Sequence, residues 1–488
     1  MPRHMIYGSP MLRLGPHRWR DPGLAVVVLA LAFGCLLEIV RVALVIPIKV
    51  PLDYNEGWNA YHAAVAMAGR GLYPSGDALF FNNYPPLSFY VVGAAGAITG
   101  DDIVAGRILS LASFAALALG ICAAVRMMGA SRLEGAFAAL VFLAMVRLFS
   151  PYVGMDDPQL LGQAIGMLGF LLLLREAPTD GSVACAALCF CIALFIKQNL
   201  VAQPVSLLCW LALYDRRRAV CFGGFCVVLA LAMLGVSMLA FGPDFVIQLF
   251  APRGYSTAAA LHSLAGWSAD RFILLGCALA AVVRFGDERC IQLCALYAGV
   301  ALALGTFFAG GDGTDRNVFF DADIALAMTI GVALRRIGAI AARRASMLRA
   351  TMACGCLCYF AAAMLVVTRG DWLAASYWHP ALDEETTDAV REIAFLRSAD
   401  GPAFCTSLAL CYWAGKAPQV DVVNLDQHIA IHPENGRALL RLVTARYFGV
   451  MQLQSLGPLW NLPQLTSVIE RAYRVDHISR YGIFLVPQ

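Results

Sequence analysis

Residues 51–90 read PLDYNEGWNAYHAAVAMAGRGLYPSGDALFFNNYPPLSFY, a stretch in which an apolar segment gives way to acids, a short helix-like run and a second apolar segment. Asp53 and Glu56 open the helix-like run, which we expect to end near residues 69–71. A polar loop follows, and Tyr-Pro-Pro-Leu at 84–87 begins the second apolar segment. Acids at the end of a membrane span are costly unless water or a partner meets them. The two acids are therefore either solvated loop charges or part of a functional site.

Composition indicates a polytopic membrane protein. Of the 488 residues, 60% are hydrophobic and 14% are charged, and the mean hydropathy is +0.69. Soluble domains carry about 25% charged residues. Most of the 16 cysteines lie in apolar runs, where cysteine is a small packing residue. Only Cys405 and Cys411 lie in a polar region, and they are a candidate disulfide in an oxidising compartment.

The first apolar run, about residues 23–50, is long enough to span a bilayer, and no small-residue cleavage site follows it. Four arginines precede this run, at positions 3, 13, 18 and 20, so the positive-inside rule predicts a cytoplasmic N-terminus. Asp53 and Glu56 then emerge on the outer face. The next apolar run, 87–99, is too short for an ordinary span, and we expect an interfacial helix there.

The same rule orients the following spans. The run 103–125 returns inward to Arg126 and Arg132, and the run 133–149 then carries residues 156–157 to the outer face. Had 87–99 been a full span, the two acid pairs would face opposite sides. We predict about eleven spans, with every strongly basic loop on the inner side. Among the later spans, we expect a break at residues 197–199 and an outer loop at 242–269. The later spans are expected at about 158–174, 183–196, 200–213, 219–241, 271–283, 290–308, 319–334 and 351–368.

Residues 371–488 differ in kind, because short apolar runs alternate with helix-like segments near 384–396 and 437–444. This pattern predicts a small α/β domain. The apolar runs lie at 403–406, 420–423, 447–453 and 483–486. We therefore predict a transmembrane domain at 1–370 and an extracytoplasmic domain at 371–488.

The polar residues that stand out all fall on the predicted outer side. They are Asp53, Glu56, Asp156, Asp157, Lys197, Arg253, Asp315, Arg316 and Asn317. A carboxylate can take the proton of an incoming hydroxyl, and another can steady positive charge at an anomeric carbon. Lysine or arginine can neutralise a departing phosphate. The alternative for each cation is a lipid headgroup, and the alternative for Asp157 is a helix cap.

Four segments resemble the membrane-embedded GT-C glycosyltransferases: DYNEG at 53–57, YPPL at 84–87, GRILS at 106–110 and DDPQ at 156–159. The likeness is to the bacterial group related to protein O-mannosyltransferases and to the aminoarabinose transferase of lipid A. It covers about residues 20–340, and it implies that the transmembrane domain at 1–370 is catalytic and lies in the cytoplasmic membrane of a bacterium. Lys197-Gln198 and the segment around Asn317 also look like recurring positions of that group.

The resemblance implies an inverting transfer of a hexose or pentose from a polyprenyl-phosphate donor to the hydroxyl of a lipid, glycan or protein acceptor. It implies Asp53 or Glu56 as the base and Asp157 as an orienting acid. Many relatives have adjacent Asp-Glu in this loop, whereas Asn55 precedes Glu56 here, so the choice of base stays open, with Asp53 preferred. The implied substrate-binding residues are Asp156, Tyr84, Arg107, Lys197, Arg316 and Asn317. Membrane lipids are further expected partners, and no nucleic acid is expected.

Metal dependence stays open, because some relatives use a divalent metal and others do not, and no metal ligand is assigned. Asp321-Ala322-Asp323 has the DxD pattern, but it opens an apolar helix, so we interpret these acids as helix-terminal. The alternative function is a transporter or flippase of lipid-linked sugars. It would need charged residues near mid-membrane, for which Glu38 and Arg41 are the candidates, and an inverted repeat, which is not apparent. A non-catalytic sensor is a third interpretation.

Overall fold

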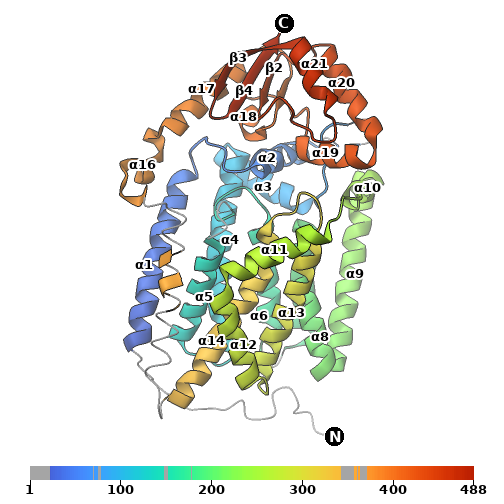
Figure 1. Ribbon diagram of the computed structural model, residues 1–488. Coiled ribbons are helices and arrows are strands. Elements are labelled where there is room, and N and C mark those ends of the chain that lie inside the picture. The colour runs from blue at the N-terminus through green and yellow to red at the C-terminus, as the bar shows by residue number, and fades with distance from the viewer. Residues whose placement is uncertain are drawn as a thin grey trace.

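The computed structural model describes residues 22–488 except 70, 75–77, 148–151, 177, 342–354, 356, 360 and 363–370. In this part the chain is mainly helical with one small sheet (Figure 1). A bundle of apolar helices carries the C-terminal region, residues 371–488, at one end, and α2 (Tyr54–Met67) and α3 (Leu87–Thr99) lie between the two.

The remaining helices of the first part run through the bundle or cross its end. They are α1 (Pro22–Val45), α4 (Asp102–Met127), α5 (Arg132–Arg147), α6 (Gln159–Leu173), α7 (Asp180–Ile196), α8 (Ala202–Tyr214), α9 (Arg216–Phe241), α10 (Asp244–Leu249), α11 (Thr257–Asp270), α12 (Phe272–Phe285), α13 (Arg289–Ala309), η1 (Arg316–Phe319) and α14 (Phe320–Ala341).

Five described helices are long and apolar enough to cross a membrane, or six if α11 and α12, which are bent by 85°, form one span. Shorter apolar helices, α3, α6, α7 and α8, accompany them. The expected interfacial segment is a helix over the predicted residues 87–99, and the turn after Ile196 separates α7 from α8 as predicted. The total of eleven spans stays a prediction. The last of them, 351–368, lies mostly outside the described residues.

The expected outer loop at 242–269 is wrong in part, because it contains α10 and α11. Ser256 caps α11 by accepting a hydrogen bond from the Ala259 N–H at 3.2 Å. Each helix buries one aromatic side chain, Phe245 in α10 and Trp267 in α11. These helices form because single buried aromatics fix a short segment whose overall composition looks like a loop.

The C-terminal region is built around a four-stranded sheet of order β1-β2-β4-β3, in which only β1 and β2 are parallel. Its elements are η2 (Asp371–Leu373), α16 (Ala375–Trp378), η3 (Pro380–Leu382), α17 (Glu384–Ser398), β1 (Ala403–Cys405), α18 (Leu408–Trp413), α19 (Val422–Ile431), η4 (Pro433–Asn435), α20 (Gly436–Thr444), β2 (Val450–Leu453), α21 (Gln464–Ala472), β3 (Tyr473–Ser479) and β4 (Gly482–Pro487). Three of the four apolar runs are strands as predicted, and both expected helices are present.

One local prediction for this region is wrong, and one strand was not predicted. The run 420–423 leads into α19, because the Asp421 carboxylate accepts a hydrogen bond from the Asn424 N–H at 3.0 Å and so caps a helix. Strand β3 was not predicted. Its residues after Tyr473 are exposed or half-buried, so the strand carries little hydrophobic signal.

The C-terminal region docks onto α2 through a shared apolar core. Trp58 and Tyr61 of α2 belong to the same buried cluster as Leu408 and Trp413 of α18. The buried carboxylate of Asp421 accepts hydrogen bonds from the Tyr54 hydroxyl and, at 2.9 Å, from the Trp58 indole. The parts of the chain predicted as two domains therefore share a core at their junction.

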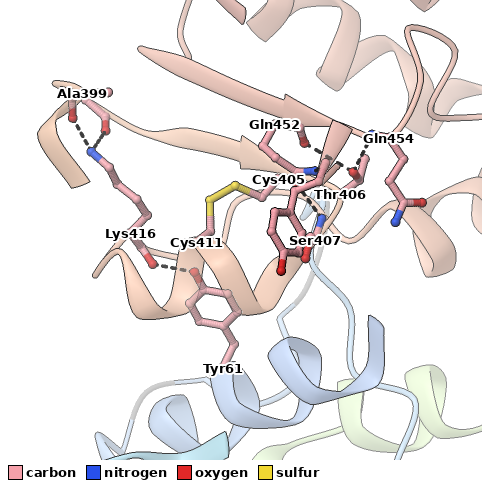
Figure 2. Close-up of a disulfide and its surroundings, with 11 residues drawn as sticks. Tyr61, Ala399, Cys405, Thr406, Ser407, Cys411, Lys416, Gln452 and Gln454 are labelled. Carbon is pink, nitrogen blue, oxygen red and sulfur yellow. Dashed lines mark hydrogen bonds between the residues drawn. A yellow bond between two sulfur atoms is a disulfide. The ribbon is translucent and has the colours of Figure 1, made fainter. Parts of the chain in front are cut away.

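Figure 2 shows that the candidate disulfide is formed and joins Cys405 at the end of β1 to Cys411 in α18. It holds α18 against the sheet. On the other side of α18 the Tyr61 hydroxyl of α2 donates a hydrogen bond to the Lys416 carbonyl at 2.7 Å. The disulfide thus restrains the element through which the C-terminal region contacts α2.

Gly57 is where α2 and α18 approach most closely. A Cβ at this position would come within 2.2 Å of the Ala409 nitrogen and 2.4 Å of the Leu408 carbonyl carbon, both backbone atoms. We expect Gly57→Ala to lower the melting temperature by about 3 °C or more, because overpacking costs about 1–3 kcal/mol. The measurement is thermal unfolding of the purified protein in detergent.

The matched control is Gly299→Ala in α13, another helical glycine, whose added Cβ would meet no atom within 4 Å. That substitution should be neutral or stabilise by up to about 1 kcal/mol, the helix preference of alanine over glycine. Equal melting temperatures for the two variants would contradict the close packing of α2 on α18.

Candidate functional site

Two cavities meet at the loop that precedes α2. The larger, of about 840 Å³, lies between Asp53 and the C-terminal region. The smaller, of about 270 Å³, lies between Lys197 and the segment that leads into α14. Gly313 lines both cavities, and Asn55 lines the smaller one, so the start of α2 stands at the boundary between them.

Asp53 is the N-cap of α2, and its carboxylate accepts a hydrogen bond from the Asn55 N–H at 2.9 Å. The side chain is half-buried and lines the larger cavity. Burial raises the pKa of the Asp53 carboxyl, and the nearby carboxylates of Asp157 and Asp315 raise this pKa further. A carboxylate with a raised pKa is a better proton acceptor than an ordinary aspartate.

Asp157 and Lys197 form a buried ion pair, with the ammonium 3.1 and 3.2 Å from the two carboxylate oxygens. Asp157 also accepts a hydrogen bond from the Gln159 N–H at 2.8 Å at the start of α6, so the capping role considered for it is present. The Lys197 ammonium lies 5.1 Å from the ring centre of Tyr84. Lys197 and Tyr84 line the smaller cavity, and Asp157 holds the lysine there from behind.

The smaller cavity has further polar groups available to a ligand. Buried Asn317 lines it, as does Arg253, which makes no ion pair with any described residue. The Gln198 amide donates to the Asn83 carbonyl at 2.7 Å, which leaves its Oε1 without a donor among the described residues. The Asn199 Oδ1 likewise has none. Two cations, the Asp315 carboxylate and the residues Gln198 and Asn199 therefore line one small space.

Arg316 does not join this group. Its side chain is 41% exposed and pairs with Asp270 at 3.3 Å, and it lines neither cavity. Arg253 instead occupies the position in the smaller cavity that was expected for Arg316. Both arginines were recognisable as outer-side cations, but their sequence neighbourhoods contain no signal for which one faces the cavity.

Glu56 and Arg107 are fully buried and paired with each other, at 2.6 Å between Nε and Oε1 and 2.8 Å between Nη2 and Oε2. Glu56 also accepts from the Leu52 N–H at 2.9 Å, and Arg107 donates to the carbonyl of Val50 at 2.7 Å. Neither side chain lines a cavity. Glu56 was expected as a possible base and Arg107 as a substrate-binding residue. Their buried positions instead suit residues that hold the loop containing Asp53.

Asp156 belongs with this buried group. Its backbone N–H donates to Glu56 at 3.3 Å, and its carboxylate lies against Gly106, where an added Cβ would come within 2.0 Å of Oδ1. Burial raises the pKa of the Asp156 carboxyl well above its usual range, and the charge of Glu56 adds to this rise. Asp156 lines neither cavity, although it was expected to bind substrate.

The carboxylates of the DxD sequence have separate structural partners. Asp323 pairs with Arg271 at 2.5 Å, and Asp321 accepts from the Tyr297 hydroxyl at 2.5 Å. Both lie in the first turn of α14, which agrees with their interpretation as helix-terminal acids. Among the described residues, no group of three or more His, Cys, Asp or Glu side chains is placed to hold a metal ion.

No protein-family model matches the chain, and no curated protein matches it by sequence. By structure it is similar to ArnT from Cupriavidus metallidurans in the apo state, at 14% identity and a TM-score of 0.60 over 93% of this chain and 98% of that one. ArnT bound to undecaprenyl phosphate gives 14% identity and a TM-score of 0.61 over 95% and 98%.

The archaeal oligosaccharyltransferase AglB from Archaeoglobus fulgidus, in complex with an inhibitory peptide and a dolichol-phosphate, gives 12% identity and a TM-score of 0.50 over 95% of this chain and 74% of that one. At such identities the likeness is one of fold. The class is therefore that of large helical proteins whose apolar bundle carries a smaller C-terminal α/β part. More particularly, the chain shares the fold of ArnT and AglB, which agrees with the fold that the resemblance of its sequence motifs implied.

The different positions of Glu56 and Asp53 predict different consequences of neutralising them. Glu56→Gln should destabilise the protein by about 3–5 kcal/mol, because it leaves the Arg107 guanidinium buried without its counter-charge. Asp53→Asn should change stability by less than about 0.5 kcal/mol, because asparagine caps helices as well as aspartate does. Thermal unfolding of both variants measures this, and a stable Glu56→Gln protein would show that the pair is not needed for folding.

Proposed function

We propose that the chain is a glycosyltransferase that moves a sugar, with inversion, from a polyprenyl-phosphate donor to an acceptor hydroxyl at the extracytoplasmic face of a bacterial cytoplasmic membrane. One observation carries this proposal. A small cavity lined by Lys197 and Arg253 adjoins a large cavity lined by Asp53, and Gly313 lines both. An inverting transfer needs such a division, because the phosphate leaves the anomeric carbon on the side opposite to the incoming hydroxyl.

The smaller cavity is proposed to hold the phosphate and sugar of the donor. Lys197 and Arg253 would neutralise the negative charge that grows on the phosphate as the glycosidic bond breaks. The side-chain amides of Gln198 and Asn199, which also line this cavity, are groups of the kind that hydrogen-bond to sugar hydroxyls. The similarity of the fold to ArnT, solved with undecaprenyl phosphate, supports a lipid-phosphate donor, whose chain would lie between helices beside α3.

Asp53 is proposed as the base. The acceptor oxygen forms a bond to the anomeric carbon, the bond from that carbon to the phosphate oxygen breaks, and the acceptor proton passes to Asp53. Asp157 would act through Lys197, and the pair of Glu56 and Arg107 would hold the loop. The sugar and any use of a divalent metal are left to experiment.

The orientation is part of the proposal. A cytoplasmic N-terminus places the C-terminal region outside the cytoplasm, and the disulfide between Cys405 and Cys411 supports this, since disulfides persist in oxidising compartments. The flippase alternative has no comparable support. Its candidate Glu38 accepts a hydrogen bond from the hydroxyl of Tyr377 at 3.1 Å, and Arg41 lies over the ring of the same tyrosine.

The direct test incubates purified protein with radiolabelled polyprenyl-phosphate sugars and follows label leaving the lipid. We expect one donor to be used, and Asp53→Asn to lower the rate about 100-fold or more, the usual contribution of a general base. A folded protein inert towards every donor, or a fully active Asp53→Asn variant, would contradict the proposal.

The rate should depend on pH through Asp53. The base works only when deprotonated, so kcat/KM should fall as pH is lowered through the raised Asp53 pKa, at a higher pH than for an ordinary aspartate. Asp315→Asn removes one of the charges that raise this pKa, so it should move the acid limb to lower pH. Asp312→Asn, at a carboxylate that lines the larger cavity with Asp53 but is not among the charges that raise this pKa, should leave the limb in place. Movement to higher pH in Asp315→Asn would contradict Asp53 as the base.

Arg253 and Arg316 form a matched pair for testing the donor site. Arg253→Gln should raise the KM for the donor about tenfold or more, because it removes a charge-assisted contact to phosphate. Arg316→Gln should change the KM by less than about twofold, as expected for a surface ion pair. Steady-state kinetics with the preferred donor measures both values. A larger increase in KM for Arg316→Gln than for Arg253→Gln would indicate that Arg316 binds the donor phosphate.

A further inference from the structure

Resting on the proposed transfer reaction, we infer that the larger cavity binds the acceptor, and that this acceptor is an uncharged glycan chain. The cavity lies on the Asp53 side of the loop, from which a hydroxyl can reach the base without crossing the donor cavity. Its volume of about 840 Å³ is roughly that of a site for a ligand of several rings. It is thus large enough for more than one sugar unit.

The polar side chains of this cavity suit sugar hydroxyls. Amides and hydroxyls from separate segments line it, namely Thr406, Ser407, Gln427, Gln454 and Asn461. The side-chain amides of Gln427 and Gln454 make no hydrogen bond to any described residue, and Figure 2 shows Gln454 beside Thr406 and Ser407 at the ends of β1 and β2. An amide both donates and accepts, as a sugar hydroxyl does, so such groups can bind an uncharged glycan directionally.

Trp460 adds an aromatic surface at the edge of the cavity. It lines the cavity and is 91% exposed, whereas Leu459 and Leu462 on either side are buried in the C-terminal region. The two leucines anchor the turn and leave the indole outside. A tryptophan offers a large, rigid apolar face at low conformational cost, and the C–H face of a pyranose ring matches it.

The turn that carries Trp460 is fixed in place. The backbone N–H of Asn461 donates to the Asp426 carboxylate at 2.8 Å, and the Asn461 amide donates to the Asp426 carbonyl and carboxylate, each at 3.1 Å. Asp426 belongs to α19, so these hydrogen bonds tie the turn that carries Trp460 to the helix that carries Gln427. A ligand would therefore meet a preorganised surface, which reduces the entropy lost on binding.

The charged side chains of the larger cavity do not suit a phosphorylated lipid. Three carboxylates line the cavity, those of Asp53, Asp312 and Asp426. The single lining cation, Arg480, is already paired with Asp388 at 3.2 Å and lies 3.7 Å from Glu384. An acceptor that carries phosphate would meet uncompensated negative charge, which costs affinity. Arg253, which makes no ion pair with a described residue, lies in the other cavity together with Lys197 and Asp315, so cations predominate there and carboxylates predominate here.

The test uses the purified full-length protein in nanodiscs and measures binding by saturation-transfer NMR. The probes are short linear neutral oligosaccharides, the same oligosaccharides carrying a phosphate, and a peptide rich in serine and threonine. Only the neutral oligosaccharides should bind well. Trp460→Ala should weaken their binding about tenfold or more, whereas Trp372→Ala, at another exposed tryptophan outside both cavities, should change it by less than about twofold. Asp53→Asn should keep binding while losing transfer.

Preferential binding of the phosphorylated or peptide probe would overturn the assignment, as would equal effects of the two tryptophan substitutions in folded proteins. Discharge of a polyprenyl-phosphate sugar by an enzyme that binds none of the oligosaccharides would overturn the acceptor assignment and keep the proposed reaction. Binding of neutral oligosaccharides by a protein that uses no polyprenyl-phosphate sugar would keep the glycan site and overturn the proposed reaction.

Discussion

The ion pair between Glu56 and Arg107 is the interaction on which the site depends. Both groups are fully removed from solvent, so the pair is tolerable only if every charge is matched. Arg107 of α4 meets this requirement by donating to carbonyl groups in the chain that leaves α1, and Glu56 by accepting from the loops on either side. The pair thereby joins α1, α2, α4 and the loop before α6, and it presents Asp53, three residues before Glu56, to the larger cavity.

The C-terminal region completes the site. Its helix α18 lies on α2 at Gly57, and the buried carboxylate of Asp421 binds Tyr54 and Trp58 from the other side. The larger cavity is enclosed between this region and the loop at Asp53, so it exists only when the two parts are docked. For this reason the shared core and the disulfide concern function as much as stability.

The distribution of charge between the cavities follows from which partners each ionic group has. Lys197 is held by Asp157 behind the smaller cavity, and Arg253 is left unpaired at its edge. In the larger cavity Arg480 is engaged by acids of the C-terminal region. The smaller cavity consequently has two cations beside the carboxylate of Asp315, whereas carboxylates predominate in the larger cavity. This difference suits the proposed reaction, in which a phosphate departs and a hydroxyl enters.

The sequence by itself determined the class of protein, the helix at 87–99, the break after α7 and most strands of the C-terminal sheet, and it offered Cys405 and Cys411 as a candidate disulfide. These depend on local hydropathy, length and charge, which neighbouring residues specify. Only the tertiary structure decided that Asp53 faces a cavity while Glu56 is buried, and that Arg253 lines the smaller cavity while Arg316 pairs with Asp270. The physical reason is that the role of a charged side chain depends on its partners, and Glu56 meets its partner 51 positions along the chain.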